Sequence, residues 1–125
     1  MINWFKRPKA LGARGEDAAA KFLKRNGFKI LARNVRLSRY EIDIIAREGD
    51  TIAFVEVKTR RSDSFAMPEE NVDARKQNHI RRAAHVYIAD HGDDETYYRF
   101  DIASVLLPDG DKPTITLYRD AFSDE

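Results

Sequence analysis

The segment from Tyr40 to Arg61 constrains the fold of this chain more than any other part of the sequence. Two apolar runs, YEIDIIAR (40–47) and TIAFVEVKTRR (51–61), are separated by Glu48 and the pair Gly49-Asp50. A short Gly-containing segment between two such runs is typical of a β-hairpin. The second run is apolar on both faces at its start, as in a strand covered on both sides. These residues therefore predict a buried hairpin whose second strand ends in charged residues.

The remaining sequence predicts helices and strands on either side of this hairpin. Apolar residues recur at helical spacing from Lys9 to Asn26, with Gly27 as a C-terminal cap, and again from Glu69 to Ala89 after Met67-Pro68. Further strands are expected at 28–34, 97–107 and 113–119, the last at an edge. The predicted order is α-β-β-β-α-β-β, a mixed central sheet flanked by helices. We expect one domain over residues 9–120, an N-terminal arm at 1–8 and an acidic tail at 121–125.

Composition restricts the classes of function. The chain has 125 residues, no cysteine and a formal net charge of +1. Disulfide frameworks, zinc ribbons and thiol catalysis are excluded, and no apolar run reaches membrane-spanning length. The N-terminus lacks the apolar core of a signal peptide, so we expect a cytoplasmic protein. A net charge near zero is too weak to indicate nucleic-acid binding by itself.

The predicted hairpin brings charged side chains together. If Gly49-Asp50 forms the turn, the numbers of opposed residues sum to 99, so Asp43 faces Glu56 and Glu41 faces Lys58. Opposed residues lie on the same side of a sheet, with Cβ atoms roughly 4.5–5.5 Å apart. Three carboxylates and one ammonium should therefore form one patch.

Two interpretations of this patch remain open from the spacing alone. Opposed carboxylates repel each other unless a cation lies between them, and hard oxygen ligands suit Mg²⁺ or Mn²⁺. The other interpretation is a salt-bridged sheet surface, with Glu41–Lys58 and Glu56–Lys58 pairs at the solvated strand ends. A single Asp followed by Glu-x-Lys is common by chance, so spacing does not separate the two.

Longer motifs give a family resemblance. EID at 41–43 followed by FVEVKTR at 54–60 resembles the PD-(D/E)xK nuclease signature. More narrowly, the chain resembles the YraN family of small bacterial proteins, which have a restriction-endonuclease-like fold and are related to archaeal Holliday-junction resolvases. The resemblance extends from Gly12 to Asp101 and includes the following motifs: GARGEDAAAKFL (12–23), NGFKIL (26–31), the helix around 76–87 and RFD (99–101). One departure is Tyr40, where the family usually has Gly; its ring could narrow the approach of a substrate.

The resemblance implies a metal site. Asp43 and Glu56 match the two metal-binding acids of the signature and Lys58 matches its lysine. The carbonyl of Val57 and the carboxylate of Glu16, from the first helix, would complete the coordination of Mg²⁺ or Mn²⁺. Without the resemblance, the favoured explanation of Glu16 is an acid early in a helix that stabilises the helix dipole.

The implied activity is metal-dependent hydrolysis of nucleic acid, with DNA as the expected polymer. Lys58 would orient the nucleophile and stabilise charge on the phosphate, with Glu41 and Glu56 holding it in place. Arg60, Arg61, Lys76 and Gln77 are candidate phosphate contacts. A nucleic-acid-binding module without catalysis is the alternative, and a protein-interaction domain with a surface salt-bridge network is a third. A homodimer is expected by analogy with the resolvases.

Overall fold

A computed structural model describes residues 11–61, 72–108 and 112–124; the predicted arm at 1–8 lies outside these residues. The elements are α1 (Leu11–Arg25), β1 (Lys29–Leu37), β2 (Tyr40–Glu48), β3 (Thr51–Arg60), α2 (Ala74–His91), β4 (Tyr97–Leu106) and β5 (Thr114–Phe122). Their order is the predicted one, and β5 is an edge strand as expected. None of the helices in the described segments is long and apolar enough to cross a bilayer.

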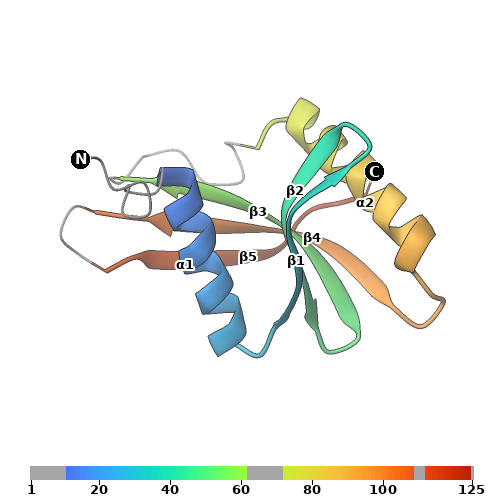
Figure 1. Ribbon diagram of the computed structural model, residues 1–125, viewed down its shortest axis with the longest axis horizontal. Helices are drawn as coiled ribbons and strands as arrows, with labels where there is room; N and C mark the ends of the chain where they lie inside the picture. Colours follow the sequence, from blue (N-terminus) through green and yellow to red (C-terminus); the bar gives the residue numbers. More distant parts are fainter. Residues whose placement is uncertain (1–10, 62–71, 109–111, 125) are drawn as a thin grey trace, which may run out of the picture.

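The five strands form one mixed sheet in the order β1-β2-β3-β4-β5 (Figure 1). Neighbouring strands are antiparallel except β3 and β4, which are parallel and are connected through α2. A parallel pair needs such a crossover connection. The sequence prediction of an α/β protein with a mixed sheet is therefore confirmed.

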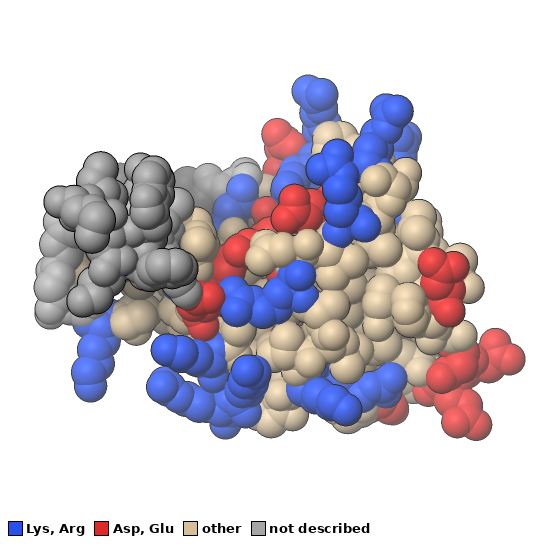
Figure 2. All heavy atoms as spheres, in the orientation of Figure 1, with Lys and Arg blue, Asp and Glu red and all other residues tan. Residues whose placement is uncertain are grey.

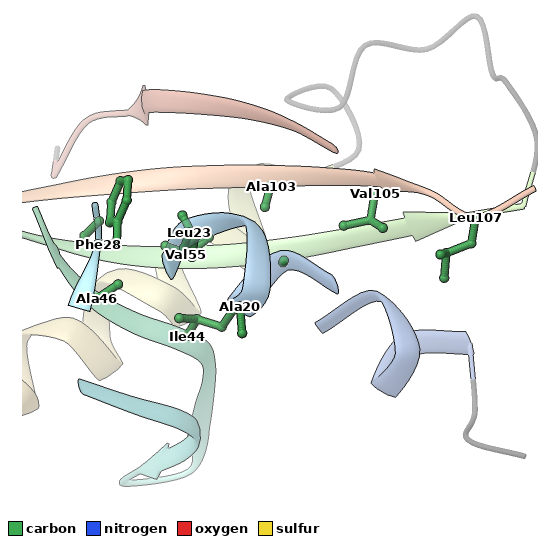
Figure 3. Packing of buried hydrophobic residues seen from close by; sticks show 11 residues of the cluster. Ala20, Leu23, Phe28, Ile44, Ala46, Val55, Ala103, Val105 and Leu107 are labelled. Carbon is green, nitrogen blue, oxygen red and sulfur yellow. The ribbon is translucent and has the colours of Figure 1, made fainter. Parts of the chain in front are cut away.

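The two helices cover opposite faces of the sheet, because β3 contributes alternate residues to two separate cores. Ala53 and Val55 pack in the core beneath α1, with Leu23 from that helix (Figure 3). Ile52 and Phe54 pack in the core beneath α2. Both faces of β3 are thus buried, as its continuous apolar run predicts.

The boundaries of three elements differ from the sequence prediction. Helix α2 begins at Ala74 rather than Glu69, since Asp73 caps it by accepting a hydrogen bond from the Lys76 N–H at 2.9 Å; Glu69 itself lies outside the described residues. Strand β1 continues to Leu37 and turns directly into β2. Strand β5 continues to Phe122, two residues into the predicted tail, because Ala121 and Phe122 pack against the core beneath α2.

The register of the central hairpin is the predicted one. Strands β2 and β3 pair from Glu48–Thr51 to Ile44–Val55, and each pair sums to 99. Strict alternation along β2, however, does not hold. Ile44 belongs to the core beneath α1, whereas Ile42 belongs to the core beneath α2 together with Ile45. The change of face falls at Asp43, the candidate metal ligand.

Candidate functional site

Asp43 lies where strands β2 and β3 separate. The pairing between these two strands, both fully described, stops at Ile44–Val55, one residue before Asp43 would oppose Glu56. The Asp43 carboxylate instead accepts a hydrogen bond from the Val57 N–H at 2.8 Å. A side-chain oxygen thus replaces a main-chain partner at the point where the ladder ends. This contact fixes Asp43 against β3 and explains why β2 changes its facing there.

Glu56 is a buried carboxylate with incomplete compensation. Only 6% of the residue is exposed, and its Oε2 atom is buried without a hydrogen-bond partner in the described part of the chain. Its ion-pair partner in the described structure is Lys76, whose Nζ lies 3.7 Å from Oε1. Burial, followed by the negative charge of Asp43, raises the pKa of Glu56 to about 7, although Lys76 and Lys58 oppose the shift. Ionisation of Glu56 at pH above 7 therefore lowers the stability of the folded protein.

Helix α1 brings Glu16 to the same place because Gly15 lets the helix approach β3 closely. A Cβ atom at position 15 would lie 2.8 Å from the Cβ of Thr59 and closer still to its hydroxyl. Any other residue at position 15 would push α1 away from the sheet. Burial and then the charge of Asp43 raise the pKa of Glu16 to about 7, and a hydrogen bond with Asp43 adds to the shift.

Asn34 on β1 holds Glu16 from the other side. With its amide nitrogen facing Glu16, Asn34 donates hydrogen bonds to Oε1 and Oε2 at 3.0 and 3.1 Å. The residue has a φ of 51°, in the left-handed region that Asn tolerates better than most side chains. Sequence reasoning missed this residue. The available signal was an Asn inside an otherwise regular strand pattern.

The carboxylates of Glu16, Asp43 and Glu56, here called the acidic site, therefore come from three elements. Glu16 approaches Asp43 from α1 and Glu56 approaches it from β3, and the charge of Asp43 raises the pKa values of both. Alternate residues of a strand lie on the same face, so Glu56 lies with Ile52 and Phe54 on the face of β3 that α2 covers. The gap between β2 and β3 thus makes Asp43 accessible to acids from both sides of the sheet.

Lys58 and Glu41 do not form the ion pairs of the salt-bridge interpretation. Both side chains lie within the described residues, and Lys58 makes no ion pair there with Glu41 or Glu56. Glu41 is exposed and lies opposite Arg36 of β1, because β2 has already left β3 at this point. The expected holding of Lys58 by these two carboxylates is therefore wrong, although its charge still lowers the pKa of Glu56.

The four candidate phosphate contacts occupy different positions. Lys76, in the first turn of α2, is partly exposed and faces Glu56. Arg60 donates to the Ser104 hydroxyl at 3.3 Å, and Arg61 is exposed directly after β3. Gln77 donates to the Val72 carbonyl at 2.9 Å and accepts from Arg81, so its amide serves the start of α2. Lys76 is the member of this group that forms an ion pair with the acidic site in the described structure.

Tyr40 is directed toward α2. Its ring stacks on His79 with centroids 4.4 Å apart, and its hydroxyl accepts a hydrogen bond from Arg82 at 3.2 Å. These contacts attach the β1–β2 hairpin to α2.

The oxygen donors of the acidic site suit a divalent cation, but the three carboxylates do not surround a single metal position in the described structure. Across residues 11–61, 72–108 and 112–124, no group of three or more His, Asp or Glu side chains is arranged to hold a metal ion. Glu56 nevertheless has a buried oxygen without a partner, and two of the three acids have raised pKa values. Oxygen donors with excess negative charge are what Mg²⁺ and Mn²⁺ require.

The fold and the site define a class: α/β proteins with a carboxylate cluster where two central strands of a mixed sheet separate. Residues 15–105 match the uncharacterised protein family UPF0102, and the chain belongs to this family. A UPF0102 protein of Caldicellulosiruptor bescii is 45% identical over 116 residues, which cover 91% of this chain and 98% of the relative. One from Nocardia farcinica is 47% identical over 106 residues, covering 85% and 84%. The family resemblance drawn from the motifs is confirmed.

A solved structure, an EndoMS-dsDNA2 complex, is a more remote match. It aligns with 79% of this chain and 39% of its own, with 17% sequence identity and a TM-score of 0.46. Similarity at this level carries no inference about the activity of this chain.

Proposed function

We propose that this protein is a metal-dependent nuclease that hydrolyses phosphodiester bonds, with DNA as the expected substrate. The observation that supports the proposal most is the Glu56 carboxylate, which is buried beside Asp43 and has one oxygen without a hydrogen-bond partner among the described residues. A structural role would favour a partner for that oxygen, whereas a cation would satisfy it and offset the charge of both acids. Asp43, Glu56, the carbonyl of Val57 and Glu16 would hold Mg²⁺ or Mn²⁺.

The chain's own residues would divide the work of the reaction. A bound divalent ion lowers the pKa of coordinated water and offsets charge on the phosphate. Lys58 lies two residues beyond Glu56 on the same face of β3, from which its ammonium would orient the nucleophile and stabilise charge on the phosphate. Arg60, Arg61 and Lys76 would bind flanking phosphates. Glu41 is exposed and paired with β1 rather than β3, so it would not hold Lys58 during the reaction.

A nucleic-acid-binding module is the second candidate. It is favoured by the open geometry of the carboxylates, which are not grouped around one metal position in the described structure. The two ion pairs on which a purely protein-binding role was based, Glu41–Lys58 and Glu56–Lys58, do not form between these described residues. A homodimer stays a prediction.

Metal-dependent cleavage separates the two candidates. The purified protein should cleave a member of a DNA panel of flaps, junctions, single strands and duplexes when Mg²⁺ or Mn²⁺ is added, and chelation should stop it. Asp43→Asn and Glu56→Gln should abolish both metal binding and cleavage, because they remove anionic ligands but keep side-chain shape. Lys58→Met should keep metal binding and lower the rate by on the order of 10²-fold or more.

Asp90→Asn and Lys24→Met, two exposed positions on the helices, are the matched controls and should cleave like the wild type. Binding without cleavage across the whole panel would favour the binding module. Cleavage that survives Asp43→Asn, Glu56→Gln and Lys58→Met would place the activity at another site.

A further inference from the structure

A second concave surface lies along α1, apart from the acidic site. It is a groove of about 790 Å³ between α1 and the start of β5, and we call it the α1–β5 groove. Its lining combines basic and apolar side chains: Arg14, Lys21, Arg25 and Lys112 are basic, and Ala18, Phe22, Leu107 and Ile115 are apolar. None of these residues belongs to the candidate nuclease site. The groove therefore needs an explanation of its own.

Charge in the groove is unbalanced. Its lining has four cationic side chains and one carboxylate, Asp17, which is already in an ion pair with Arg33 of β1 at 2.8 Å. Arg14, Lys21 and Arg25 lie on one face of α1, spaced by about 10 Å and about 6 Å along the helix axis. Figure 2 shows lysine and arginine side chains gathered on the part of the surface formed by α1. A row of cations of this kind fits an extended polyanion.

The groove also has an apolar floor. Phe22 is half-buried and packs against the core beneath α1 with one side, which leaves part of its ring in the groove. Leu107 and Ile115 continue the apolar surface toward β5. Acidic peptides need only the cations, whereas nucleotides combine an anionic backbone with flat bases that stack on aromatic rings. A duplex keeps its bases stacked inside and could not use this floor.

We propose that the α1–β5 groove binds a single-stranded segment of nucleic acid, with phosphates along Arg14, Lys21 and Arg25 and a base against Phe22. The inference rests on the proposed function in taking nucleic acid as the substrate. Helix α1 presents Glu16 to the acidic site on one side and borders the groove on the other, so a strand extending past the site would cross α1 to reach the groove. The groove would thereby favour substrates with a single-stranded tail.

Binding can be measured without cleavage. Fluorescence anisotropy of a labelled oligothymidylate in EDTA reports the affinity of the intact protein for a single strand. Lys21→Gln combined with Arg25→Gln should weaken binding by about tenfold at low salt and reduce the salt slope by about 1.4, since each single-strand phosphate contact contributes about 0.7. Lys24→Gln combined with Lys29→Gln removes two exposed cations outside the groove and should change neither quantity. Equal losses for the two double variants would overturn the proposal.

Two further measurements separate the groove from its alternatives. Phe22→Leu keeps the floor apolar but removes the aromatic face, and we expect roughly fivefold weaker binding, with a melting curve to verify the fold. Unchanged affinity would rule out stacking, and polyglutamate competing as well as the oligonucleotide would identify an acidic-peptide site instead. Asp43→Asn should keep single-strand binding in EDTA. If the wild type never cleaves but the groove variants still lose affinity, the proposed nuclease function fails and the groove assignment stands.

Discussion

Two groups of carboxylates on the same sheet have opposite electrostatic balances. Glu48 and Asp101, near the β2–β3 turn, are matched by two arginines. Arg99 donates to Glu48 at 2.6 Å and to Asp101 at 2.9 Å, while Arg119 donates to Glu48 at 2.8 Å. The hydrogen bonds from Arg119 and then Arg99 lower the pKa of Glu48 to about 2, despite its partial burial. Asp101 is thus paired with Arg99, and this group has a structural role.

The acidic site is the contrasting case. Among the described residues, Lys76 is the one cation within ion-pair distance of Glu56, and Asn34 supplies a neutral donor to Glu16. The pKa values of Glu16 and Glu56 rise to about 7 where that of Glu48 falls. Ionisation of the Glu48–Asp101 group thus stabilises the folded protein, whereas ionisation of the acidic site destabilises it. Strained electrostatics of this kind is a marker of functional sites.

The largest expected effect comes from breaking the balanced group. Arg99→Met removes the cation shared by Glu48 and Asp101 and leaves the fully buried Asp101 carboxylate without its ion pair. We expect a loss of about 3–5 kcal/mol in the free energy of unfolding, measured by denaturant titration at pH 7. Arg36→Met, on the exposed part of β1, is the control and should change stability little. A loss below 1 kcal/mol would show that this group is not a structural ion-pair network.

An intermediate effect of opposite sign is expected in the acidic site. Because the folded pKa of Glu56 is about 7 and its ordinary value is 4.5, its contribution to stability is present below pH 4.5 and is lost as pH rises through 7. Glu56→Gln should therefore stabilise the metal-free protein by about 1–3 kcal/mol at pH 8 and have little effect at pH 4. Denaturant titrations at the two pH values test this. Destabilisation by Glu56→Gln at pH 8 would contradict an uncompensated site.

Added metal should sharpen the same contrast. Mn²⁺ stabilises whatever state binds it, so wild-type protein at pH 8 should gain stability with metal while Glu56→Gln should not. The comparison uses one substitution and reports binding independently of cleavage. If the melting temperatures of both proteins respond equally to Mn²⁺, the ion binds elsewhere.

The contrast also shows which features sequence reasoning could reach. The hairpin register was predicted from Gly49-Asp50 and the two apolar runs. The predicted pairs are correct from Glu48–Thr51 to Ile44–Val55. The prediction failed one residue later, because pattern and turn geometry do not show where a ladder ends. Asp43 replaces a main-chain partner there, so Glu41 turns toward β1 and Lys58 loses the partner expected for it.

Long-range contacts explain the other omissions. Gly15 and Asn34 shape the acidic site through close packing on Thr59 and through a left-handed backbone conformation. Neither carries a charge, and neither was given a role in the site on the basis of the sequence. Lys76 was expected to contact phosphate, and its ion pair with Glu56 depends on where the first turn of α2 packs. Tertiary packing, which spacing along the chain does not encode, decided each of these.

The smallest expected effect concerns Lys76, the cation that forms an ion pair with Glu56 in the acidic site. Its side chain is 42% exposed and its Nζ is 3.7 Å from Glu56, a geometry in which ion pairs contribute roughly 0–1 kcal/mol. Lys76→Met should destabilise the metal-free protein by this amount at pH 8. Because the pKa of Glu56 would rise further, the decrease in stability caused by its ionisation should extend to higher pH. In the Glu56→Gln background the same substitution should have no effect, and a double-mutant cycle measures the difference. An equal cost in both backgrounds would mean that Lys76 stabilises α2 through contacts other than Glu56 and does not act as a counter-ion of the acidic site.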